Sequence, residues 1–467
     1  MQKNIISSSL NENISLMNQV LDTTTNYDIL YHSIQIGSKQ GCYYFIDGFC
    51  KDDIMQKITQ FFMEMQESDT PKDAYNFLKK FLPYPEIGKG KEIQDIEKQI
   101  LSGVIVLFVD VFDYAVYIDA RTYPARGITE PDKEKTLCGS KDGFVETIVF
   151  NTALLRRRIR SSDLKIEMFQ AGKSSKTDIA VCYMKKRVNT AFLNQLKSKI
   201  SEITIDALTV NQESLAECLY RQKWFNPFPK FRYTERPDIA SAQVMEGNIV
   251  IFTDNSPFAM VLPTSLFDIM EEADDYYFPP LTGTYLRLSR MLIGIVSFLI
   301  TPTFLLFMLH PGWIPDSFAF VKIKETVNIP IFFQFLILEL AIDGLRLAAV
   351  NTPSMLSTPL SIMAALVLGE FSVNSGWFNA EVMLYMAFVA IANYTQTSYE
   401  LGYAIKFLRI LTLILTSIFS LPGYIAGIMI FILLLAFNKT VSGTPYLAPL
   451  LPFQPKKLYH RLFRKQL

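Results

Sequence analysis

Long apolar runs follow one another through the last third of the chain, from Met291 to Phe437, with short polar breaks between them. The uncharged run Met291–Leu309 is long enough to cross ~30 Å of hydrocarbon as an α-helix. The pattern predicts further spans at Ile331–Val350, Met355–Val373, Glu381–Tyr394, Ile405–Ser420 and Leu421–Phe437. Pro422-Gly423 falls within the apolar block that holds the last two, so we expect a helical hairpin there.

Lysine and arginine residues give an independent test of this arrangement, because cytoplasmic loops carry an excess of them. Arg287 and Arg290 precede the first predicted span, and a basic cluster at 456–465 follows the last one. The segment Phe371–Ala380, between the third and fourth spans, contains neither residue type. Two lysines in the first outer loop depart from the pattern. We therefore expect the region before the spans and the C-terminal tail to lie in the cytoplasm.

Residues 1–286 alternate short β-like runs with helical patterns, which is typical of α/β domains. A stretch rich in proline, glycine and charge, Arg121–Glu146, divides this region. The predicted fold class is an α/β cytoplasmic region of two subdomains, followed by an all-α polytopic membrane domain of about six transmembrane helices. The predicted boundaries are a mobile N-terminal segment 1–26, α/β subdomains 27–125 and 126–286, a membrane domain 287–438 and a basic cytoplasmic tail 439–467.

Composition narrows the classes of function. The 45 basic and 45 acidic residues give a formal net charge of +0, which does not favour binding to nucleic acid. The 5 cysteines and 3 histidines lack metal-ligand spacing, so we expect no metal site and no cofactor. The N-terminal residues lack the apolar core of a signal peptide, so we expect the first span to direct insertion.

No nucleophile, nucleotide or metal motif typical of an enzyme stands out, so we expect a protein that is not an enzyme. Gly88-Lys89-Gly90-Lys91 lacks the spacing of a phosphate-binding loop, which favours a flexible linker. Gly139-Ser140-Lys141-Asp142-Gly143 precedes a helix that we expect to begin near Asp142. Two interpretations are open there: an anion held by free N–H groups, or an N-capping aspartate between turn glycines.

Several stretches resemble a known family. The runs RTYPARGITEPDKEKTLCGSKDGFVETIVFNTALLRRRIR from Arg121 and ERPDIASAQVMEGNIVIFTDNSPFAMVLPTSLFDIMEEADDYYF from Glu235, with the membrane block, are similar to the A-subunit family of bacterial spore germinant receptors (the GerA family). The resemblance implies a polytopic protein of the spore inner membrane whose N-terminal region faces the spore core. It also implies a homo-oligomeric ring, such as a pentamer, that passes monovalent cations in germination beside other membrane germination proteins.

A group of charged residues forms a candidate assembly or signalling motif: Glu130, Asp142, Arg156, Arg157, Arg158 and Arg160. The arginines point to different sides of a helix, so some of them must meet carboxylates. Intersubunit ion pairs, binding of anionic lipid and a solvated helix face stay open as interpretations.

The second predicted span contains Glu339, Asp343 and Arg346 at spacing i, i+4 and i+7, which places them on one face of a helix. A charge near the bilayer centre costs ~2.5–3.5 kcal/mol, so these charges require partners or water. Arg346 can neutralise one of the two carboxylates. Two interpretations stay open: a buried polar network that fixes helix packing, or an acidic face that lines a path for cations.

Small residues mark the third predicted span, which supplies the pore candidates Ser361, Ala364, Val367, Leu368 and Glu370. Small side chains permit close helix packing. Alternatively, a ring of such helices surrounds a narrow pore, with Val367 or Leu368 as a hydrophobic gate and Glu370 at its mouth. The preferred hypothesis is an oligomeric cation channel or channel-like subunit of spore germination. The alternative is a non-conducting receptor or scaffold subunit.

Overall fold

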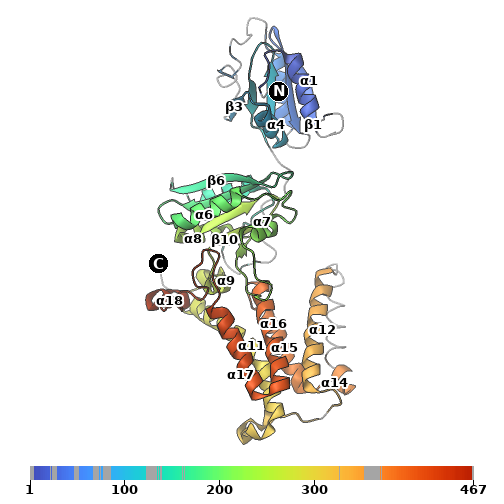
Figure 1. Ribbon diagram of the computed structural model, residues 1–467, viewed down its shortest axis with the longest axis vertical. Coiled ribbons are helices and arrows are strands. Elements are labelled where there is room, and N and C mark those ends of the chain that lie inside the picture. Colours follow the sequence, from blue (N-terminus) through green and yellow to red (C-terminus); the bar gives the residue numbers. More distant parts are fainter. Residues whose placement is uncertain are drawn as a thin grey trace. The chain divides into compact units, whose positions relative to one another are not determined.

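The computed structural model describes residues 5–21, 23, 29–46, 52–66, 73, 75–76, 86–121, 134, 136, 139–159, 161, 163–325, 327–351, 369 and 371–464. The chain divides into two compact units, residues 1–126 and 127–467, and we describe each by itself (Figure 1).

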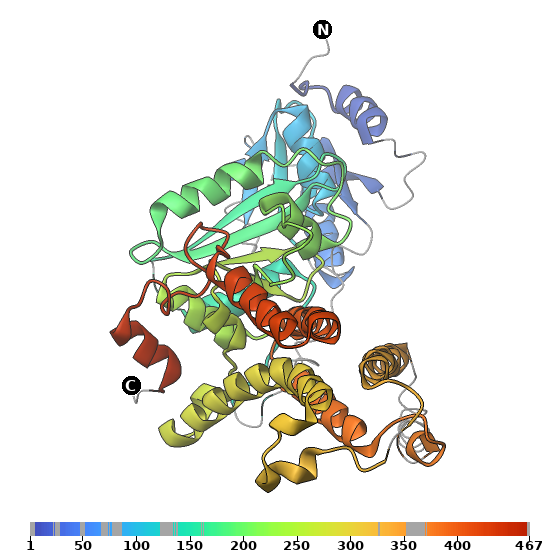
Figure 2. The ribbon, with the colours of Figure 1, turned by 60° about the horizontal axis from the view of Figure 1, so that its bottom comes forward.

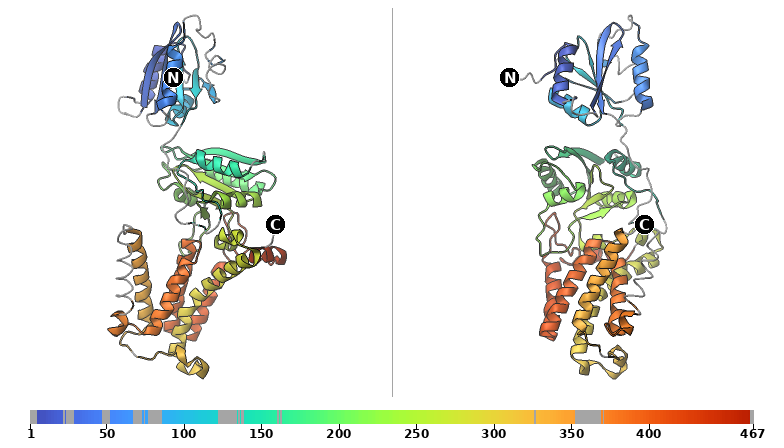
Figure 3. Two further views of the ribbon diagram at one scale, coloured as in Figure 1. Left: turned by 180° about the vertical axis from the view of Figure 1, so that it is seen from behind. Right: turned by 90° about the vertical axis from the view of Figure 1, so that its right-hand side faces the viewer.

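The first unit is built on an antiparallel five-stranded sheet with the order β1-β2-β4-β5-β3. Its elements are α1 (Leu10–Leu21), β1 (Ile29–Ile36), β2 (Lys39–Ile46), α2 (Asp52–Met63), β3 (Ile87–Gly90), α4 (Ile93–Leu101), β4 (Ile105–Val109) and β5 (Ala115–Ile118). Helices α1 and α4 pack on one face and α2 on the other (Figure 3, right). Every residue of β4 is buried, which confirms the central strand that its unbroken apolar run predicts.

Two expectations for this unit are wrong. Residues 10–21 do not form a mobile segment but a helix, because Leu10, Met17 and Leu21 share one face and are buried against the sheet. Gly88 and its neighbours are not a linker either. They form the edge strand β3, in which Gly88 pairs with Tyr117 and packs beneath the Tyr117 ring.

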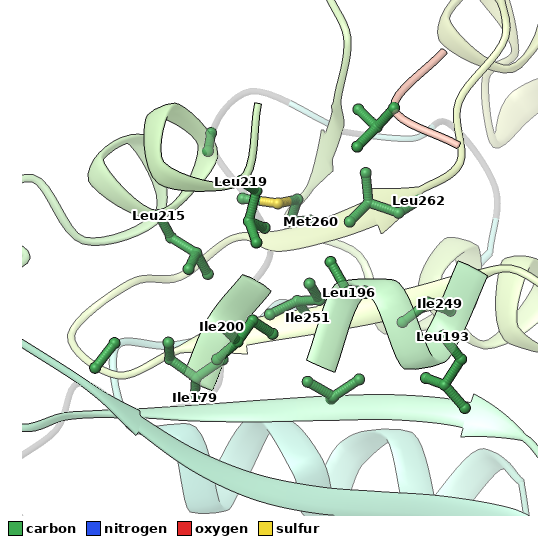
Figure 4. Packing of buried hydrophobic residues seen from close by; sticks show 14 of the residues in the cluster. Ile179, Leu193, Leu196, Ile200, Leu215, Leu219, Ile249, Ile251, Met260 and Leu262 are labelled. Atoms are coloured by element: carbon green, nitrogen blue, oxygen red, sulfur yellow. The ribbon is translucent and has the colours of Figure 1, made fainter. Parts of the chain in front are cut away.

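The second unit begins with another antiparallel five-stranded sheet, in the order β6-β7-β9-β10-β8. Its elements are α5 (Ile148–Arg158), β6 (Leu164–Ala171), β7 (Thr177–Met184), α6 (Thr190–Ser201), α7 (Asn211–Leu219), β8 (Arg232–Thr234), α8 (Pro237–Glu246), β9 (Ile249–Thr253) and β10 (Ala259–Leu262). Leu193 and Leu196 of α6 and Leu215 of α7 pack on one face, against Ile251 and Met260 (Figure 4). Helices α5 and α8 cover the other face.

Helices make up the rest of this unit. They are α9 (Leu266–Met270), α10 (Asp274–Tyr277), α11 (Pro280–Leu309), α12 (Ile331–Asn351), α14 (Ser372–Asn374), α15 (Ala380–Tyr394), α16 (Tyr399–Phe419), α17 (Leu421–Ala436) and α18 (Pro455–Leu462), with the 3₁₀ turns η2 (Pro311–Trp313) and η3 (Asp316–Val321). Helix α16 packs along both α11 and α17, and α12 lies at one edge of the bundle (Figure 2).

Two described helices, α11 and α16, are long and apolar enough to cross a membrane. Helices α15 and α17 are apolar but shorter. Helix α12 is as long as α16, and each carries three charged residues, but those of α12 all lie in its interior, whereas Glu400 of α16 lies in the first turn of that helix. Residues 352–368 and 370, which include most of the third predicted span, lie outside the described residues. The total of six spans therefore stays a prediction.

The expected hairpin of the last two helices is confirmed, with its turn at Ser420. Glycines of α17 let its backbone approach α16: a Cβ atom added to Gly423 would lie 1.9 Å from the Leu415 carbonyl oxygen, and one on Gly427 would lie 2.6 Å from the Thr412 side chain. Small residues at such positions are typical of closely packed membrane helices.

Candidate functional site

A cluster of charges, most of them buried, joins the second sheet to the first long helix and to the C-terminal helix. We call it the charged joint, and it consists of Arg232, Asp268, Glu271, Glu272, Asp275, Arg287, Arg290 and Arg461. These residues come from β8, α9, the turn before α10, α10 itself, the start of α11, and α18.

Asp275 is the centre of the joint, because its carboxylate is fully buried and meets two arginines of α11. Arg290 holds it with both ends of its guanidinium group, Nη1 at 3.0 Å from Oδ2 and Nη2 at 3.2 Å from Oδ1. Nε of Arg287 donates to Oδ2 at 3.5 Å. A two-pronged arginine–carboxylate pair is strong and fixes orientation as well as distance.

Arg461 and Arg232 extend the joint to the C-terminal helix and to the sheet. Arg461 lies 2.8 Å from Asp268 and 3.3 Å from Glu271. Arg232, in β8, donates from Nη2 to the Glu271 carbonyl oxygen at 2.9 Å. Arg287 in turn donates to the Arg461 carbonyl oxygen at 2.8 Å. The sheet, the C-terminal helix and α11 are therefore linked by direct contacts.

The local sequence explains how these groups are positioned. Ser265 and Asp268 form a capping box that begins α9. Gly283 lies in the first turns of α11, where a Cβ atom would come within 2.1 Å of the Asp275 carbonyl oxygen. Glycine at this position lets α10 lie directly against α11. Since arginines and carboxylates are matched and mutually bonded, the joint can hold and orient helices, and it offers no free base or nucleophile.

A second connection, which we call the Lys230 clasp, ties the segment before β8 to the loop after α17. Lys230 is buried and donates to Asn438 Oδ1 and, at 2.6 Å, to the Lys439 carbonyl oxygen. Asn226 donates to Asn438 Oδ1 at 2.9 Å. The ring of Phe228 packs between Phe431 of α17 and Tyr446. The α/β subdomain is therefore attached to both ends of the helical sequence, at α11 and after α17.

The clasp predicts a dependence of stability on pH. Burial lowers the pKa of Lys230 from 10.5 to about 8. The folded protein therefore disfavours the charged amine, and between pH ~8 and ~10.5 the unfolded chain binds one proton more than the folded chain. We expect the stability of the wild type, relative to the Lys230→Met variant, to rise by ~1.4 kcal/mol per pH unit in that window and to be flat below pH ~8. Denaturant unfolding of the two detergent-solubilised proteins measures this difference, and a constant difference across the window would contradict it.

A cavity of about 390 Å³ adjoins the joint, between the sheet and the loop that connects α15 to α16. Arg232, Glu271 and Glu272 line it from the joint, and residues 396–400 line it from the loop. Thr397 of that loop donates to the Ile269 carbonyl oxygen at 2.5 Å. The loop is therefore tied to α9 by this hydrogen bond, while the cavity separates it from the sheet.

The charged residues of the second predicted span find partners on α16. Arg409 donates from Nε to Glu339 Oε1 at 2.7 Å, and both side chains are buried. Lys406 pairs with Asp343 and lies 3.5 Å from Glu339 Oε2. The expectation that Arg346 neutralises one of these carboxylates is wrong. Its guanidinium group lies over the rings of Tyr394 and Tyr403 instead, at 5.3 and 5.4 Å.

The candidate assembly motif is described in part. Asp142 pairs with Arg158 at 2.6 Å, within one chain. The helix begins at Ile148 with Thr147 as its N-cap, so Asp142 is not the N-capping residue that the glycine pattern favoured. Arg157 is an exposed member of α5. Glu130 and Arg160 lie outside the described residues, and so does the side chain of Arg156.

The pore candidates Ser361, Ala364, Val367, Leu368 and Glu370 all lie outside the described residues. By contrast, the joint was not anticipated from the sequence. Its signal was the acidic run Glu271-Glu272-Ala273-Asp274-Asp275, which precedes Arg287 and Arg290 by a few helical turns.

Comparison with known proteins decides the family. The profile described as "Bacillus/Clostridium GerA spore germination protein" matches residues 15–467. The chain belongs to the GerA family. It is 36% identical to Stage V sporulation protein AF of Bacillus subtilis (strain 168), over 94% of this chain and 89% of that protein. It is 29% identical to the uncharacterized membrane protein YfkQ of the same strain, over 96% of this chain and 87% of that protein.

One solved structure also matches a part of this GerA-family chain. It is the N-terminal domain of the A subunit of the Bacillus megaterium spore germinant receptor GerK3, with 24% identity and a TM-score of 0.23, over 56% of this chain and 97% of that one. The resemblance stated from the sequence motifs is confirmed by the family match. Membership in the GerA family supports a role in spore germination.

Proposed function

We propose that this GerA-family protein is a multi-pass subunit of the spore inner membrane, with its N-terminal region and C-terminal tail on the core side. The described loops support this arrangement, because they gather at two ends of the bundle. At one end His310 Nε2 lies 2.5 Å from Ser420 Oγ, and Asn379 donates to the Glu325 carbonyl oxygen. At the other end lie the charged joint, the Lys230 clasp and Thr397. An even number of membrane crossings returns the chain to the side on which the second sheet lies.

Within this arrangement the protein relays a signal from the α/β region to the membrane helices. One observation carries this step: Arg290 binds the buried Asp275 through two nitrogens, and α11 continues from Arg290 into its apolar stretch as far as Pro302, the proline inside it. Because the part of α11 before Pro302 is held at its first turns by these ion pairs, it moves with the structure that holds it. The role is therefore mechanical, and we propose that the protein is not an enzyme.

The output of the relay is cation conduction by a homo-oligomer, for which a pentamer is the simplest ring. The third predicted span then faces the ring axis, where Val367 or Leu368 closes the path by excluding water and Glu370 attracts monovalent cations. Other membrane germination proteins act beside this ring. Membership in the GerA family supports a role in spore germination, and the small residues of the third predicted span support a pore.

A non-conducting receptor or scaffold subunit is the second candidate, and the contacts of α12 favour it. Glu339 and Asp343 are neutralised by Arg409 and Lys406 of the same chain. These acids therefore serve helix packing and leave no acidic face on the described part of α12 for cations.

Flux measurements on the purified full-length protein in liposomes test the proposal. We expect monovalent cations to cross these liposomes faster than empty ones, with flux raised by Val367→Ser or Leu368→Ser and blocked by Leu368→Trp. The control is Phe304→Ser in α11, because the buried Phe304 ring packs on Phe335 and Tyr385 and its loss affects stability instead. Wild-type permeability in both serine variants, in protein that is still inserted and assembled, would favour the scaffold.

A further inference from the structure

An aromatic tip projects from the segment that leads into the Lys230 clasp. Trp224 is 95% exposed and Phe225 is 54% exposed, and their rings meet edge to face at 6.3 Å. The residues just before them, Arg221 and Lys223, are exposed as well, and the Lys223 amine lies 5.8 Å from the Phe225 ring. A large aromatic pair left in water beside basic residues is unusual for a surface loop and marks an interaction site.

The contacts of the next residues fix the level of this tip along the helical bundle. Asn226 donates to Asn438 Oδ1, and Asn438 comes two residues after the end of α17 at Ala436. Consecutive Cα atoms are ~3.8 Å apart, so Trp224 lies within ~8 Å of Asn226 along the chain. Phe437, at the same end of α17, is 80% exposed. The tip and Phe437 therefore form a set of exposed aromatic side chains where an apolar helix ends.

We propose that Trp224 and Phe225 insert into the lipid headgroup region of the membrane leaflet in which α17 ends, and that Arg221 and Lys223 contact the phosphates of anionic lipids. The inference rests on the proposed membrane insertion of the helices. Tryptophan favours the boundary between hydrocarbon and water, where its ring is shielded and its N–H still finds a partner. Basic residues next to such a ring add attraction to a negatively charged leaflet.

This insertion gives the α/β subdomain a contact with lipid beside its contacts with the helices. Because Asn226 and Lys230 tie the same segment to the loop after α17, the tip holds the clasp at a fixed depth. The lipid surface thereby becomes part of the support on which the subdomain sits. Lipid composition then acts on the same segment that leads into β8 and the charged joint.

Tryptophan fluorescence of the full-length protein tests the proposal. The substitutions Trp313→Phe and Trp377→Phe leave Trp224 as the single tryptophan. In phosphatidylcholine vesicles that contain phosphatidylglycerol, we expect lipids brominated near the headgroup end of the acyl chain to quench Trp224 several-fold, and aqueous iodide to quench it several-fold less than a free indole. Replacing Arg221 and Lys223 together by glutamine should weaken the bromolipid quenching and remove its dependence on phosphatidylglycerol.

A matched control separates this proposal from membrane insertion itself. It carries Ile432→Trp, an exposed position in α17, with Trp224, Trp313 and Trp377 replaced by phenylalanine. Quenching of the Ile432→Trp protein by bromolipid, together with full iodide access to Trp224, would overturn the lipid contact and leave the proposed function intact. Protection of Trp224 from both quenchers would also overturn it, since a protein partner would then cover the tip. Absence of bromolipid quenching in both proteins would overturn the membrane insertion.

Discussion

Replacing Asp275 by alanine should lower the free energy of unfolding by roughly 3–5 kcal/mol, because it leaves Arg287 and Arg290 buried without the carboxylate that they share. Glu271 and Glu272 still reach Arg287 and Arg290, so the cost arises mainly from the one positive charge of the joint that is left without a carboxylate. Thermal or denaturant unfolding of the detergent-solubilised protein measures it.

Glu272→Ala is the matched control for Asp275→Ala. The Glu272 carboxylate also contacts Arg290, at 2.5 Å, but it is 44% exposed. Exposed pairs contribute only ~0–1 kcal/mol, so this variant should remain close to the wild type. Arg290→Met added to Asp275→Ala should recover part of the loss, since well-packed apolar side chains tolerate the place of a buried ion pair. Equal losses for Asp275→Ala and Glu272→Ala would contradict the central position of Asp275.

Arg409→Met should be about as damaging, with an expected loss of roughly 3–5 kcal/mol, because Glu339 then lacks its closest partner in an apolar bundle. Arg409 also donates to the Ser297 carbonyl oxygen of α11, so its loss loosens three helices together. Replacing Glu339 by leucine in the same chain should restore stability to within ~1 kcal/mol, because no unpaired charge remains.

The variant Glu339→Gln separates helix packing from cation conduction as the role of Glu339 in α12. If Glu339 serves packing, Glu339→Gln destabilises the protein and any loss of flux follows the loss of assembled protein. If Glu339 lines a path for cations, Glu339→Gln lowers the flux of protein that is as stable as the wild type. Asp343→Asn is the control, since the Asp343 carboxylate is partly exposed and should cost less. Failure of the leucine–methionine double variant to recover stability would contradict the packing interpretation.

The apolar helices could be read from the sequence because their signal is local. Runs of apolar residues gave the positions of α11, α12, α15, α16 and α17 to within a few residues at most ends, apart from the polar first turns of α11 and α16. Pro422-Gly423 marked the turn of the hairpin, since proline is favoured in the first turn of a helix.

The N-terminal helix shows how a weak local signal is lost. Leu10, Ile14, Met17 and Leu21 recur at helical spacing, yet the many polar residues between them favoured a mobile segment. The sheet decides the outcome, because one face of β2 and β4 would be exposed without α1 and α4. Burial of that face is a property of the whole unit, and no short window of sequence reports it.

Several ion pairs could not be predicted because the partners are far apart in the chain. In the charged joint Arg461 and Glu271 are separated by 190 residues, and in the helical bundle Arg409 and Glu339 are separated by 70. From the sequence, Arg287 and Arg290 were explained as cytoplasmic charges that flank a span, and this explanation concealed their burial. From the sequence, Arg346 was expected to neutralise either Glu339 or Asp343, because all three lie on one helical face. The packing of α12 beside α16 brings Arg409 and Lys406 to these carboxylates instead.

Labelling of single cysteines tests most directly the central claim that the helical half crosses a membrane and returns to the side of the α/β subdomain. Ser375 follows α14 and Lys456 lies in α18, and both are exposed. In chains whose native cysteines are replaced by serine, a membrane-impermeant maleimide should label Ser375→Cys in intact cells, and should label Lys456→Cys only after permeabilisation. Labelling of Lys456→Cys in intact cells, or protection of Ser375→Cys until permeabilisation, would contradict the account.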